Sequence, residues 1–524
     1  MYSYIIKNVT ILDGTGRERW KADIGIEGER IKSVGAIETT KAREIIDASG
    51  FYASPGAIDL LNHSDTHWTL FEEPSQESLL KQGITTIIGG ACGSSLAPIV
   101  DGNTLRSIQK WVDISRINAN WRSTAEFFAE LEKHKFGVNF GTLVGHGTLR
   151  RNVMGDSASE ANEDEIDRMK LLLKESLIAG AFGLSFGLAF SHGRPASRHE
   201  LVSLSSFVAA SNKLVAMHLK DEGREFLSSV AEAVDVARSS GANLEISHIK
   251  AIGTKAWQDT PKALDMIKSA IKEGLSINAD VFPYLRTGSL LYTLVPEWVR
   301  EGGKEAIIAK LHSPQERVQI LDGLRALTLH YDKITIASTL RKSGLIGKTL
   351  FEAAQILGMS NEEAMLEILF INDLAVTIFG ETLNEENLVE MIKEPFTMFS
   401  SDGIGKSKRG ELGSNLIHPR SYGTVPKVLS YFVRDKNVLS LEEAVKKMTS
   451  MPAEKLGLRE RGKIEKGYFA DLIIFDPVTI RDNATYADPY EYPGGIEWVF
   501  VNGEPAVIKG SYRGALQGKI LRKM

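Results

Sequence analysis

Cysteine is nearly absent from this chain, because Cys92 is the only one among 524 residues. A single cysteine excludes a disulfide within the chain, and a protein without a disulfide framework is typical of a reducing compartment. Long apolar runs are missing too, since no window approaches the ~18 apolar residues that a membrane-spanning helix needs. The first residues show no basic segment followed by an apolar core, as a secretory signal would. We therefore expect a cytoplasmic protein that does not bind membranes.

The chain also lacks an excess of either charge. It holds 62 Lys and Arg against 67 Asp and Glu, which gives a formal net charge of −5 at pH 7. The chain therefore lacks the excess of basic residues that is typical of nucleic-acid-binding proteins, and we expect no nucleic acid as a partner. A hydrophobic share of 43% is typical of a globular chain, and 524 residues indicate one large domain with additions or several domains. The sequence leaves the oligomeric state open.

What the sequence does contain is a long alternation of strand and helix patterns, which is typical of parallel βαβ units. Eight such repeats predict an α/β fold of the TIM (β/α)8 barrel class. A doubly wound sheet is the alternative, but polar residues aimed at one centre from several strands favour closure. The predicted barrel strands are 57–62, 84–90, 138–145, 183–188, 214–219, 244–249, 276–282 and 396–401.

Both ends of the chain carry strand patterns without intervening helices. These apolar segments are joined by glycine-containing turns, and they are 5–12, 24–35, 470–477 and 496–508. We expect a small β-sandwich domain built from 1–54 plus 460–524, and a barrel domain of 55–459 between them. The strand rhythm lapses late in the barrel, which predicts an insertion at 286–345 that acts as a lid.

Cys92 occupies a special place in this scheme. The buried strand pattern that ends at Ile88 is followed by glycines, which allow a sharp turn and deliver Cys92 just beyond the strand's carboxyl end. Active sites of α/β barrels lie at that end. A lone cysteine is most often a small buried hydrophobe, yet the glycine-rich surroundings favour a metal ligand or a nucleophile.

Three more polar residues follow predicted strands: His218, His248 and Asp402. A single histidine there is usually structural, and a single aspartate often caps the next helix. The two histidines are one βαβ repeat apart, so we expect them on adjacent strands. A thiolate and two imidazoles form a ligand set that suits catalytic zinc with an open position for water. The sequence therefore predicts a zinc site.

The chain resembles the N-acyl-D-amino-acid deacylases (D-aminoacylases) of the amidohydrolase superfamily over nearly its whole length. The motifs that carry the resemblance are Pro55-Gly56-Ala57-Ile58-Asp59 with His63-Ser64-Asp65, Gly90-Ala91-Cys92-Gly93-Ser94-Ser95-Leu96-Ala97-Pro98, Gly145-His146-Gly147-Thr148-Leu149-Arg150, Met217-His218-Leu219-Lys220-Asp221-Glu222-Gly223, Ser247-His248-Ile249-Lys250, Ser401-Asp402-Gly403 and His418-Pro419-Arg420-Ser421-Tyr422-Gly423-Thr424. The family's fold is a barrel with a small β-domain from both ends and a late insertion, which agrees with the patterns above.

The resemblance implies roles for individual residues. Cys92, His218 and His248 become ligands of one tightly held zinc ion, and Asp402 becomes the base that accepts a proton from the attacking water. The family has His-x-His after the first strand, but here Leu61 takes the first position and only His63 remains. We therefore expect the second metal position to be weak or empty.

The resemblance also implies a clamp on the α-carboxylate of an N-acyl-amino acid. Arg420 would grip the carboxylate bidentately, with Lys250 and Tyr284 beside it and Ser289 adding a hydrogen bond. Four nearby polar residues have no decided role at this stage: Asp65, His67, His146 and Glu222.

The predicted function is zinc-dependent hydrolysis of N-acyl-D-amino acids, or of small peptides with a D residue. The preference for D substrates follows from the resemblance alone. A cyclic-amide hydrolase of the dihydroorotase or hydantoinase kind is one alternative, but it would need a carboxylated lysine on the fourth strand, and 183–188 contains none. A metal-free binding protein on a decayed barrel is the other alternative.

Overall fold

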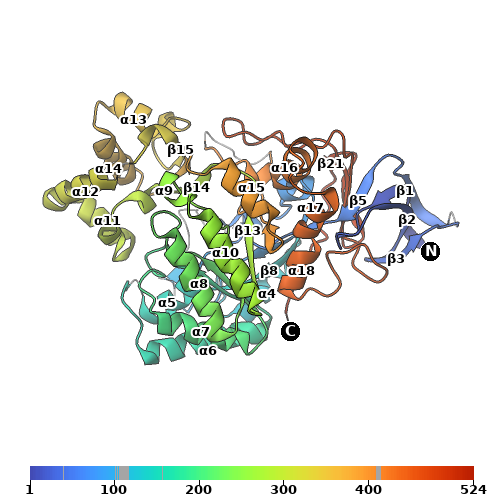
Figure 1. Cartoon of the computed structure of the whole chain (residues 1–524), viewed down its shortest axis with the longest axis horizontal. Helices are drawn as coiled ribbons and strands as arrows, with labels where there is room; N and C mark the ends of the chain where they lie inside the picture. The colour runs from blue at the N-terminus through green and yellow to red at the C-terminus, as the bar shows by residue number, and fades with distance from the viewer. Residues whose placement is uncertain are drawn as a thin grey trace.

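Parallel strands, each followed by helical segments, form the middle of the chain (Figure 1). The computed structural model describes residues 1–524 except 39–40, 101, 103, 106–116, 118, 156, 328, 409–414 and 524. One parallel sheet has the order β6-β7-β8, and another has the order β17-β13-β12-β11-β10-β9. The strands are β6 (Ala57–Asp59), β7 (Ile84–Gly89), β8 (Asn139–Thr142), β9 (Val144–Gly145), β10 (Gly183–Gly187), β11 (Leu214–His218), β12 (Asn243–Ile246), β13 (Ile277–Val281) and β17 (Thr397–Phe399).

Each of the eight predicted strand ranges overlaps at least one of these strands, and the range 138–145 divides into β8 and β9. The strands are short and almost fully buried, as expected for parallel strands covered by helices. Their side chains contribute to one extended apolar core, which includes Ile87, Leu184, Val215 and Ile246.

The helices beside these strands begin and end at clear sequence signals. Helix α6 (Glu163–Ala179) starts with a capping box between Asn162 and Glu165 and ends at Gly180, whose φ is 111°. Others that flank the strands are α4 (Thr124–Leu131), α5 (His146–Met154), α7 (Arg198–Ala209), α8 (Phe226–Ser240), α9 (Thr254–Trp257), α10 (Thr260–Lys272), α15 (Glu385–Lys393), α16 (Arg420–Lys427), α17 (Leu441–Met448) and α18 (Ser450–Leu456). Shorter helices α1 (Thr69–Glu72) and α2 (Glu77–Lys81) follow β6. Among the described residues, no helix is both long and apolar enough to cross a membrane.

The two ends of the chain share one nine-stranded sheet, at the right of Figure 1. The sheet is mixed: β1 pairs in parallel with β4 and β5, whereas the other strand pairs of the sheet are antiparallel. β5 and β18 join the ends, with Pro55 opposite Leu472. The Asn502-Gly503 turn between β19 and β20 has φ values of 49° and 83°, as a tight hairpin requires. The strands are β1 (Tyr2–Ile11), β2 (Trp20–Glu27), β3 (Arg30–Gly35), β4 (Ala42–Asp47), β5 (Tyr52–Pro55), β18 (Leu472–Phe475), β19 (Ile496–Val501), β20 (Glu504–Ile508) and β21 (Ser511–Tyr512).

A further unit with its own core follows β13 and lies at the upper left of Figure 1. It contains the antiparallel sheet β14-β16-β15 and helices α11 to α14. The sequence predicts no strand directly after Tyr284, but β14 lies there. Its sequence Thr-Gly-Ser-Leu has no apolar alternation, so only its pairing with β16 defines it as a strand. The elements are β14 (Thr287–Leu290), α11 (Gly303–His312), α12 (Pro314–Leu327), β15 (Ile334–Thr339), α13 (Leu350–Leu357), α14 (Asn361–Ile371) and β16 (Val376–Gly380).

Candidate active site

Three side chains that could hold a metal ion converge where β7, β11 and β12 end. The ligand atoms of Cys92, His218 and His248 all lie within 4.8 Å of one another. Cys92 Sγ is 3.4 Å from His248 Nε2, and the two imidazole rings are 4.3 Å apart and nearly perpendicular. His218 Nδ1 is buried and has no hydrogen-bond partner among the described residues. One sulfur and two imidazoles with an unsatisfied ring nitrogen fit a zinc ion.

The backbone at this site adopts conformations that few residues tolerate. Cys92, His248 and Asp402 have φ values of 51°, 37° and 47°, in the left-handed region that favours glycine. The Cys92 turn is also packed tightly, because a Cβ atom on Gly187 would lie 2.2 Å from the carbonyl oxygen of Cys92. Strained conformations of this kind persist where the surrounding structure holds them, commonly at functional sites.

The side chains of this cluster are electrostatically coupled. Burial raises the pKa of the Cys92 thiol, but His248, His218 and His63 lower it, so that it falls well below its usual value. Burial and Lys250 lower the pKa of His248, whereas Cys92 and Glu222 raise it, with a net result of about 10. The thiolate that zinc requires is therefore the favoured form of Cys92.

Asp402 lies beside this cluster and holds two partners. The His63 Nε2–H group donates to Asp402 Oδ1 at 3.0 Å, and Arg420 Nη1 lies 2.6 Å from Asp402 Oδ2. Burial raises the pKa of Asp402, but Arg420 and His63 lower it well below its usual range. Asp402 is therefore ionised at neutral pH, as an acceptor of protons must be.

Glu222 and Lys250 form a buried ion pair next to His248. Glu222 Oε1 is 2.5 Å from Lys250 Nζ and 3.2 Å from His248 Nδ1. Although burial raises the pKa of Glu222, Lys250 and the two histidines hold it well below its usual range. Glu222 therefore contacts both a histidine and a cation.

An apolar surface adjoins the cysteine. Leu61, Ala91 and Cys92 form a buried cluster against which Phe190 packs. The Phe190 ring is also 5.0 Å from the ring of His218. Leu61 therefore places hydrocarbon next to the thiol, where the resemblance implies an imidazole in related chains.

The other proposed clamp residues do not all meet at Arg420. Tyr284 is buried and donates its hydroxyl hydrogen to Asp482 Oδ2 at 2.8 Å. Burial and the Asp482 carboxylate raise its pKa well above the usual value. Ser289 pairs with Thr293 at 3.1 Å, but the preceding residue lies against Arg420, since a Cβ atom on Gly288 would be 3.5 Å from Arg420 Nη2.

The structure also shows the surroundings of residues without a decided role. His146 lies in a fully buried network with Glu200 and Arg150, at 2.7 Å and 2.6 Å from Glu200. The Gly90 N–H group donates to Asp65 Oδ2 at 2.7 Å, which anchors the turn that leads to Cys92. His67 lies with its ring 6.3 Å from that of His63.

Sequence reasoning missed several neighbours of the clamp. The Arg420 guanidinium lies 4.9 Å above the Phe282 ring. The backbone N–H group of Arg420 donates to His418 Nδ1. His418 belongs to the His-Pro-Arg motif, which was a usable signal. Asp482 lies in an irregular segment of the C-terminal part, and nothing in its local sequence marks it as a partner of Tyr284.

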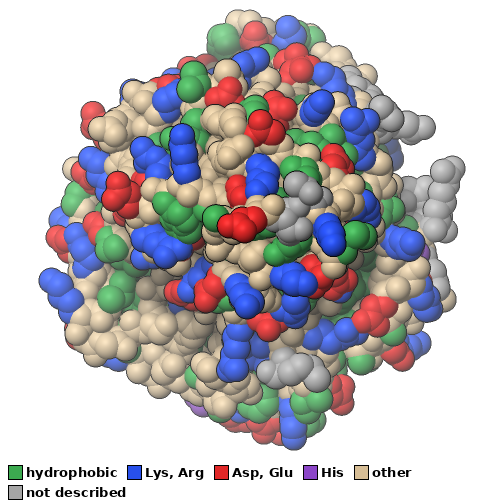
Figure 2. Space-filling model, turned by 90° about the vertical axis from the view of Figure 1, so that its right-hand side faces the viewer, with side chains coloured by type: hydrophobic (Ala, Val, Ile, Leu, Met, Phe, Trp, Pro, Cys, Tyr) green, Lys and Arg blue, Asp and Glu red, His purple; other side chains and the backbone are tan. Residues whose placement is uncertain are grey.

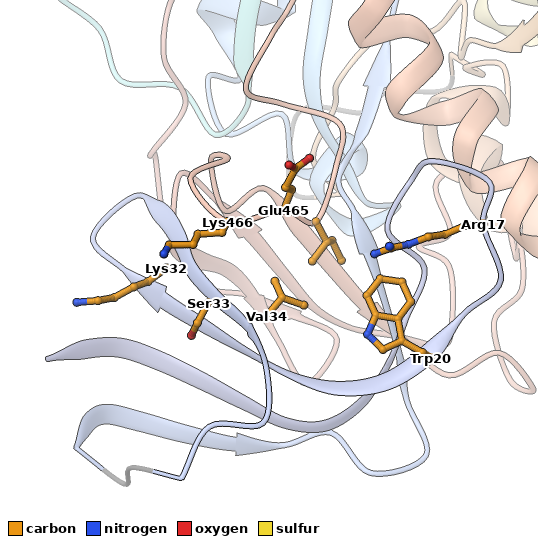
Figure 3. Close-up of a pocket in the computed structure, with 8 residues that line it drawn as sticks. Arg17, Trp20, Lys32, Ser33, Val34, Glu465 and Lys466 are labelled. Carbon is orange, nitrogen blue, oxygen red and sulfur yellow. The ribbon is translucent and has the colours of Figure 1, made fainter.

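Other surface features lie away from this cluster. A cavity of about 470 Å³ opens on the nine-stranded sheet and is lined by Arg17, Trp20 and Lys466, among others (Figure 3). Arg17 stacks on Trp20 at 3.9 Å and pairs with Asp13, so its charge is compensated. Figure 2 shows basic and acidic side chains interspersed over the face at the right of Figure 1. None of the residues that line this cavity belongs to the cluster around Cys92.

Known proteins resemble this chain over its full length. The sequence model of the amidohydrolase family matches residues 44–507. An N-acyl-D-glutamate deacylase of Alcaligenes xylosoxydans xylosoxydans is 31% identical over 99% of this chain and 96% of its own length. The structure of an N-acyl-D-glutamate deacylase from Bordetella bronchiseptica, with zinc and a phosphonate mimic of the tetrahedral intermediate, has a TM-score of 0.85, 28% identity and 99% coverage of both chains. A D-aminoacylase structure described by its binuclear metal centre has a TM-score of 0.84, 29% identity and complete coverage of both chains.

Proposed function

Because the chain belongs to the amidohydrolase family, we propose that it is a zinc-dependent hydrolase that cleaves N-acyl-D-amino acids to a carboxylate and a free D-amino acid. The observation that carries this proposal is the convergence of Cys92, His218 and His248 beside an Asp402–Arg420 ion pair. The relatives named above act on N-acyl-D-amino acids, and this likeness is the basis for the D preference.

The proposed chemistry divides between the metal and the protein. Zinc held by Cys92, His218 and His248 would lower the pKa of a water molecule and polarise the amide carbonyl. Asp402 accepts the proton of the attacking water and returns it to the departing amine. The His63 N–H group orients the Asp402 carboxylate by donating to Oδ1.

Arg420 has two tasks in this scheme. Its Nε atom is buried and has no hydrogen-bond partner among the described residues, so a donor remains for a ligand. When the α-carboxylate of the substrate binds this guanidinium, the ion pair between Arg420 and Asp402 weakens. The pKa of Asp402 then rises, which makes it a stronger base. Substrate binding would thus activate the base.

Lys250, Tyr284 and Ser289 complete the proposed clamp. Lys250 lies closest to the metal cluster, 2.8 Å from His248 Nδ1. Tyr284 would have to exchange its bond to Asp482 for one to the substrate, and Ser289 would approach from β14, which lies over Arg420. These two assignments rest on the resemblance.

We further propose that one zinc ion suffices. Leu61 contributes no ligand and packs against Cys92, so a second ion would have His63 but not its usual companion. The related D-aminoacylase is described in terms of one-metal activation and second-metal attenuation, which agrees with activity from one ion.

The architecture that we infer is a closed barrel with two additions. Closure is supported by Asn62 bridging Gly403 and by the Asp402 N–H group donating to the Leu61 carbonyl oxygen at 3.0 Å, which link β17 to β6. A β-sandwich of 1–54 and 460–524 is supported by the 5.4 Å contact between Tyr4 and Phe500, whose strands are not neighbours in the sheet. The sheet must fold over itself to bring these rings together.

We propose the unit after β13 as the insertion over the site within the barrel domain of 55–459. Its separate core runs from Leu291 to Ile378, so the inserted unit is longer than the range 286–345. β14 connects it to the site, since this strand lies against Arg420.

A substrate panel tests the proposed function. Zinc-loaded protein is incubated with the N-acetyl derivatives of D- and L-methionine, glutamate and aspartate, and released amine is quantified. We expect release from at least one D derivative, with Asp402→Asn as the inactive control. Release from L derivatives alone would contradict the stereochemical assignment. Ring opening of a hydantoin to its N-carbamoyl amino acid, without amine release from any linear amide, would support the cyclic-amide alternative.

A further inference from the structure

Glu222 lies between the metal-binding and substrate-binding parts of the site. It follows β11 in the loop that leads to α8, four positions after His218, and it is only 9% exposed. Among the described residues, its carboxylate contacts the side chains of His248, Lys250 and His218. A buried carboxylate whose partners are all functional side chains is more than a structural ion pair.

One oxygen of Glu222 serves two of these partners. Oε1 lies 2.5 Å from Lys250 Nζ and 3.2 Å from His248 Nδ1, while Oε2 is 3.9 Å from His218 Nε2. The other nitrogen of His248, Nε2, faces the Cys92 sulfur at 3.4 Å. Lys250 Nζ lies 2.8 Å from the same Nδ1 atom, so Glu222 and Lys250 together contact this side of the ring. These contacts hold the His248 ring with Nε2 turned toward the sulfur, in the orientation that a metal ligand needs.

Lys250 depends on the same oxygen for a different reason. Its ammonium group lies 2.8 Å from His248 Nδ1 and is 11% exposed, so it faces the metal cluster with little water around it. Without the Glu222 carboxylate, a buried ammonium group and the metal ion would lie on opposite sides of one imidazole ring. The repulsion between these two positive charges, uncompensated by an anion, would destabilise the site. Glu222 therefore allows a cationic substrate clamp to lie beside a metal centre.

We propose that Glu222 is a positioning residue that couples the metal centre to the substrate clamp, because its Oε1 atom holds both His248 and Lys250. This inference rests on the proposed function for the identity of the clamp. Loss of the charge at this position should weaken zinc retention and substrate-carboxylate binding together, although neither zinc nor substrate touches Glu222 in this scheme.

Glu222→Gln tests the proposal, since it keeps the size of the side chain and removes its charge. Zinc-loaded variant and wild type are mixed with excess chelator, and zinc release is followed over time. We expect release to be about tenfold faster in the variant, as for other residues that orient metal ligands. Glu225→Gln is the matched control, because Glu225 is exposed and its carboxylate bonds only to Ser228 among the described residues; its release rate should equal that of the wild type.

A second measurement separates positioning from general disruption. KM is measured for the best N-acetyl-amino acid of the panel and for its carboxamide, which lacks the α-carboxylate. Glu222→Gln should raise KM several-fold for the acid and leave it unchanged for the carboxamide. In a Lys250→Met background, Glu222→Gln should raise KM for the acid no further, because the residue through which it acts is gone.

The outcomes distinguish this inference from the proposed function. Unchanged zinc release in Glu222→Gln, or an equal rise of KM for acid and carboxamide, would overturn the coupling while leaving the hydrolase intact. Failure of the wild type to hold zinc or to release amine would overturn the proposed function itself. If Glu222→Gln does not fold, zinc release is measured in Glu222→Gln/Lys250→Met, which leaves no unpaired cation at this place. Release at the rate of Lys250→Met alone would equally refute the proposal.

Discussion

Single residues set which ligand atoms this site offers to a metal ion. Cys92, His218 and His248 supply one sulfur and two ring nitrogens, whereas Leu61 supplies hydrocarbon against the same sulfur. Leu61 is 2% exposed, so its side chain fills space that a ligand could occupy. The residue at position 61 should therefore control the second metal.

Restoring a histidine at this position tests that idea. Leu61→His places an imidazole two residues before His63, and we expect bound zinc to rise from about one to about two ions per chain after dialysis. Elemental analysis measures the ratio. Leu61→Asn, which is polar but a poor zinc ligand, should stay near one ion, and an unchanged ratio in Leu61→His would show that Leu61 does not limit the site.

Asp402 presents a second case at the residue scale. Its two oxygens are held by His63 and Arg420, so an amide in its place keeps the shape but loses the proton acceptor. Asp402→Asn should retain zinc and lose turnover by about 100-fold or more. Zinc content and initial rates on the same sample check this, and near-normal turnover would exclude Asp402 as the base.

At the scale of elements, the segment after β13 is fixed by contacts with a distant part of the chain. Tyr284 donates to Asp482, which lies 198 residues away, and Tyr486 accepts a hydrogen bond from the Arg286 N–H group. Lys427 of α16 lies 4.6 Å from the Tyr284 ring. The wall of the site beside Arg420 thus depends on the C-terminal part of the chain.

The titration of Asp482 provides a test of this connection. Burial raises its pKa to about 6, although Tyr284 and Lys427 oppose the shift. Because the folded pKa exceeds the ordinary one, this group stabilises the fold at low pH and loses that contribution as pH rises toward and through 6. The stability of the wild type minus that of Asp482→Asn should therefore fall between pH 4 and 7, by on the order of 2–3 kcal/mol.

Urea unfolding at several pH values measures this difference. Asp488→Asn is a suitable control, because Asp488 is exposed and lies six residues from Asp482; its difference from wild type should be flat across the same range. A difference for Asp482→Asn that grows with rising pH would contradict the raised pKa of Asp482.

At the scale of the whole molecule, the last residues tie distant strands together. The Phe140 N–H group donates to the Lys519 carbonyl oxygen at 2.9 Å, and the Leu521 N–H group donates to the Phe140 carbonyl oxygen at 2.7 Å. The buried Lys213 ammonium group donates to the carbonyl oxygen of Lys523 at 2.6 Å. The C-terminal segment therefore pairs with β8 and satisfies a buried charge next to β11.

Removal of residues 517–524 should lower the thermal midpoint by several degrees, because each lost hydrogen bond contributes about 1 kcal/mol. Zinc content should stay the same, since none of the three ligands contacts this segment. Scanning calorimetry and elemental analysis check both expectations. Arg522→Ala removes a partly exposed pair with Glu132 and a contact of the guanidinium with the Phe128 ring, but no backbone hydrogen bond, so its effect should be smaller.

Much of the site could be predicted from the sequence because its chemistry lies at strand ends. Buried apolar runs identified the strands, and the carboxyl ends of parallel strands meet, so Cys92, His218 and His248 had to lie close together. Their donor types then indicated zinc. The helix ends were equally readable, as the capping box of α6 and Gly180 show.

The tertiary structure alone decided which charges share a partner. Arg420 grips Asp402, Glu222 divides one oxygen between His248 and Lys250, and Tyr284 turns to Asp482. These contacts join residues that are far apart along the chain, and no local sequence pattern specifies them. Residue types and strand positions determine which groups reach the site, whereas their pairing depends on how the packed elements bring side chains within about 3 Å of each other.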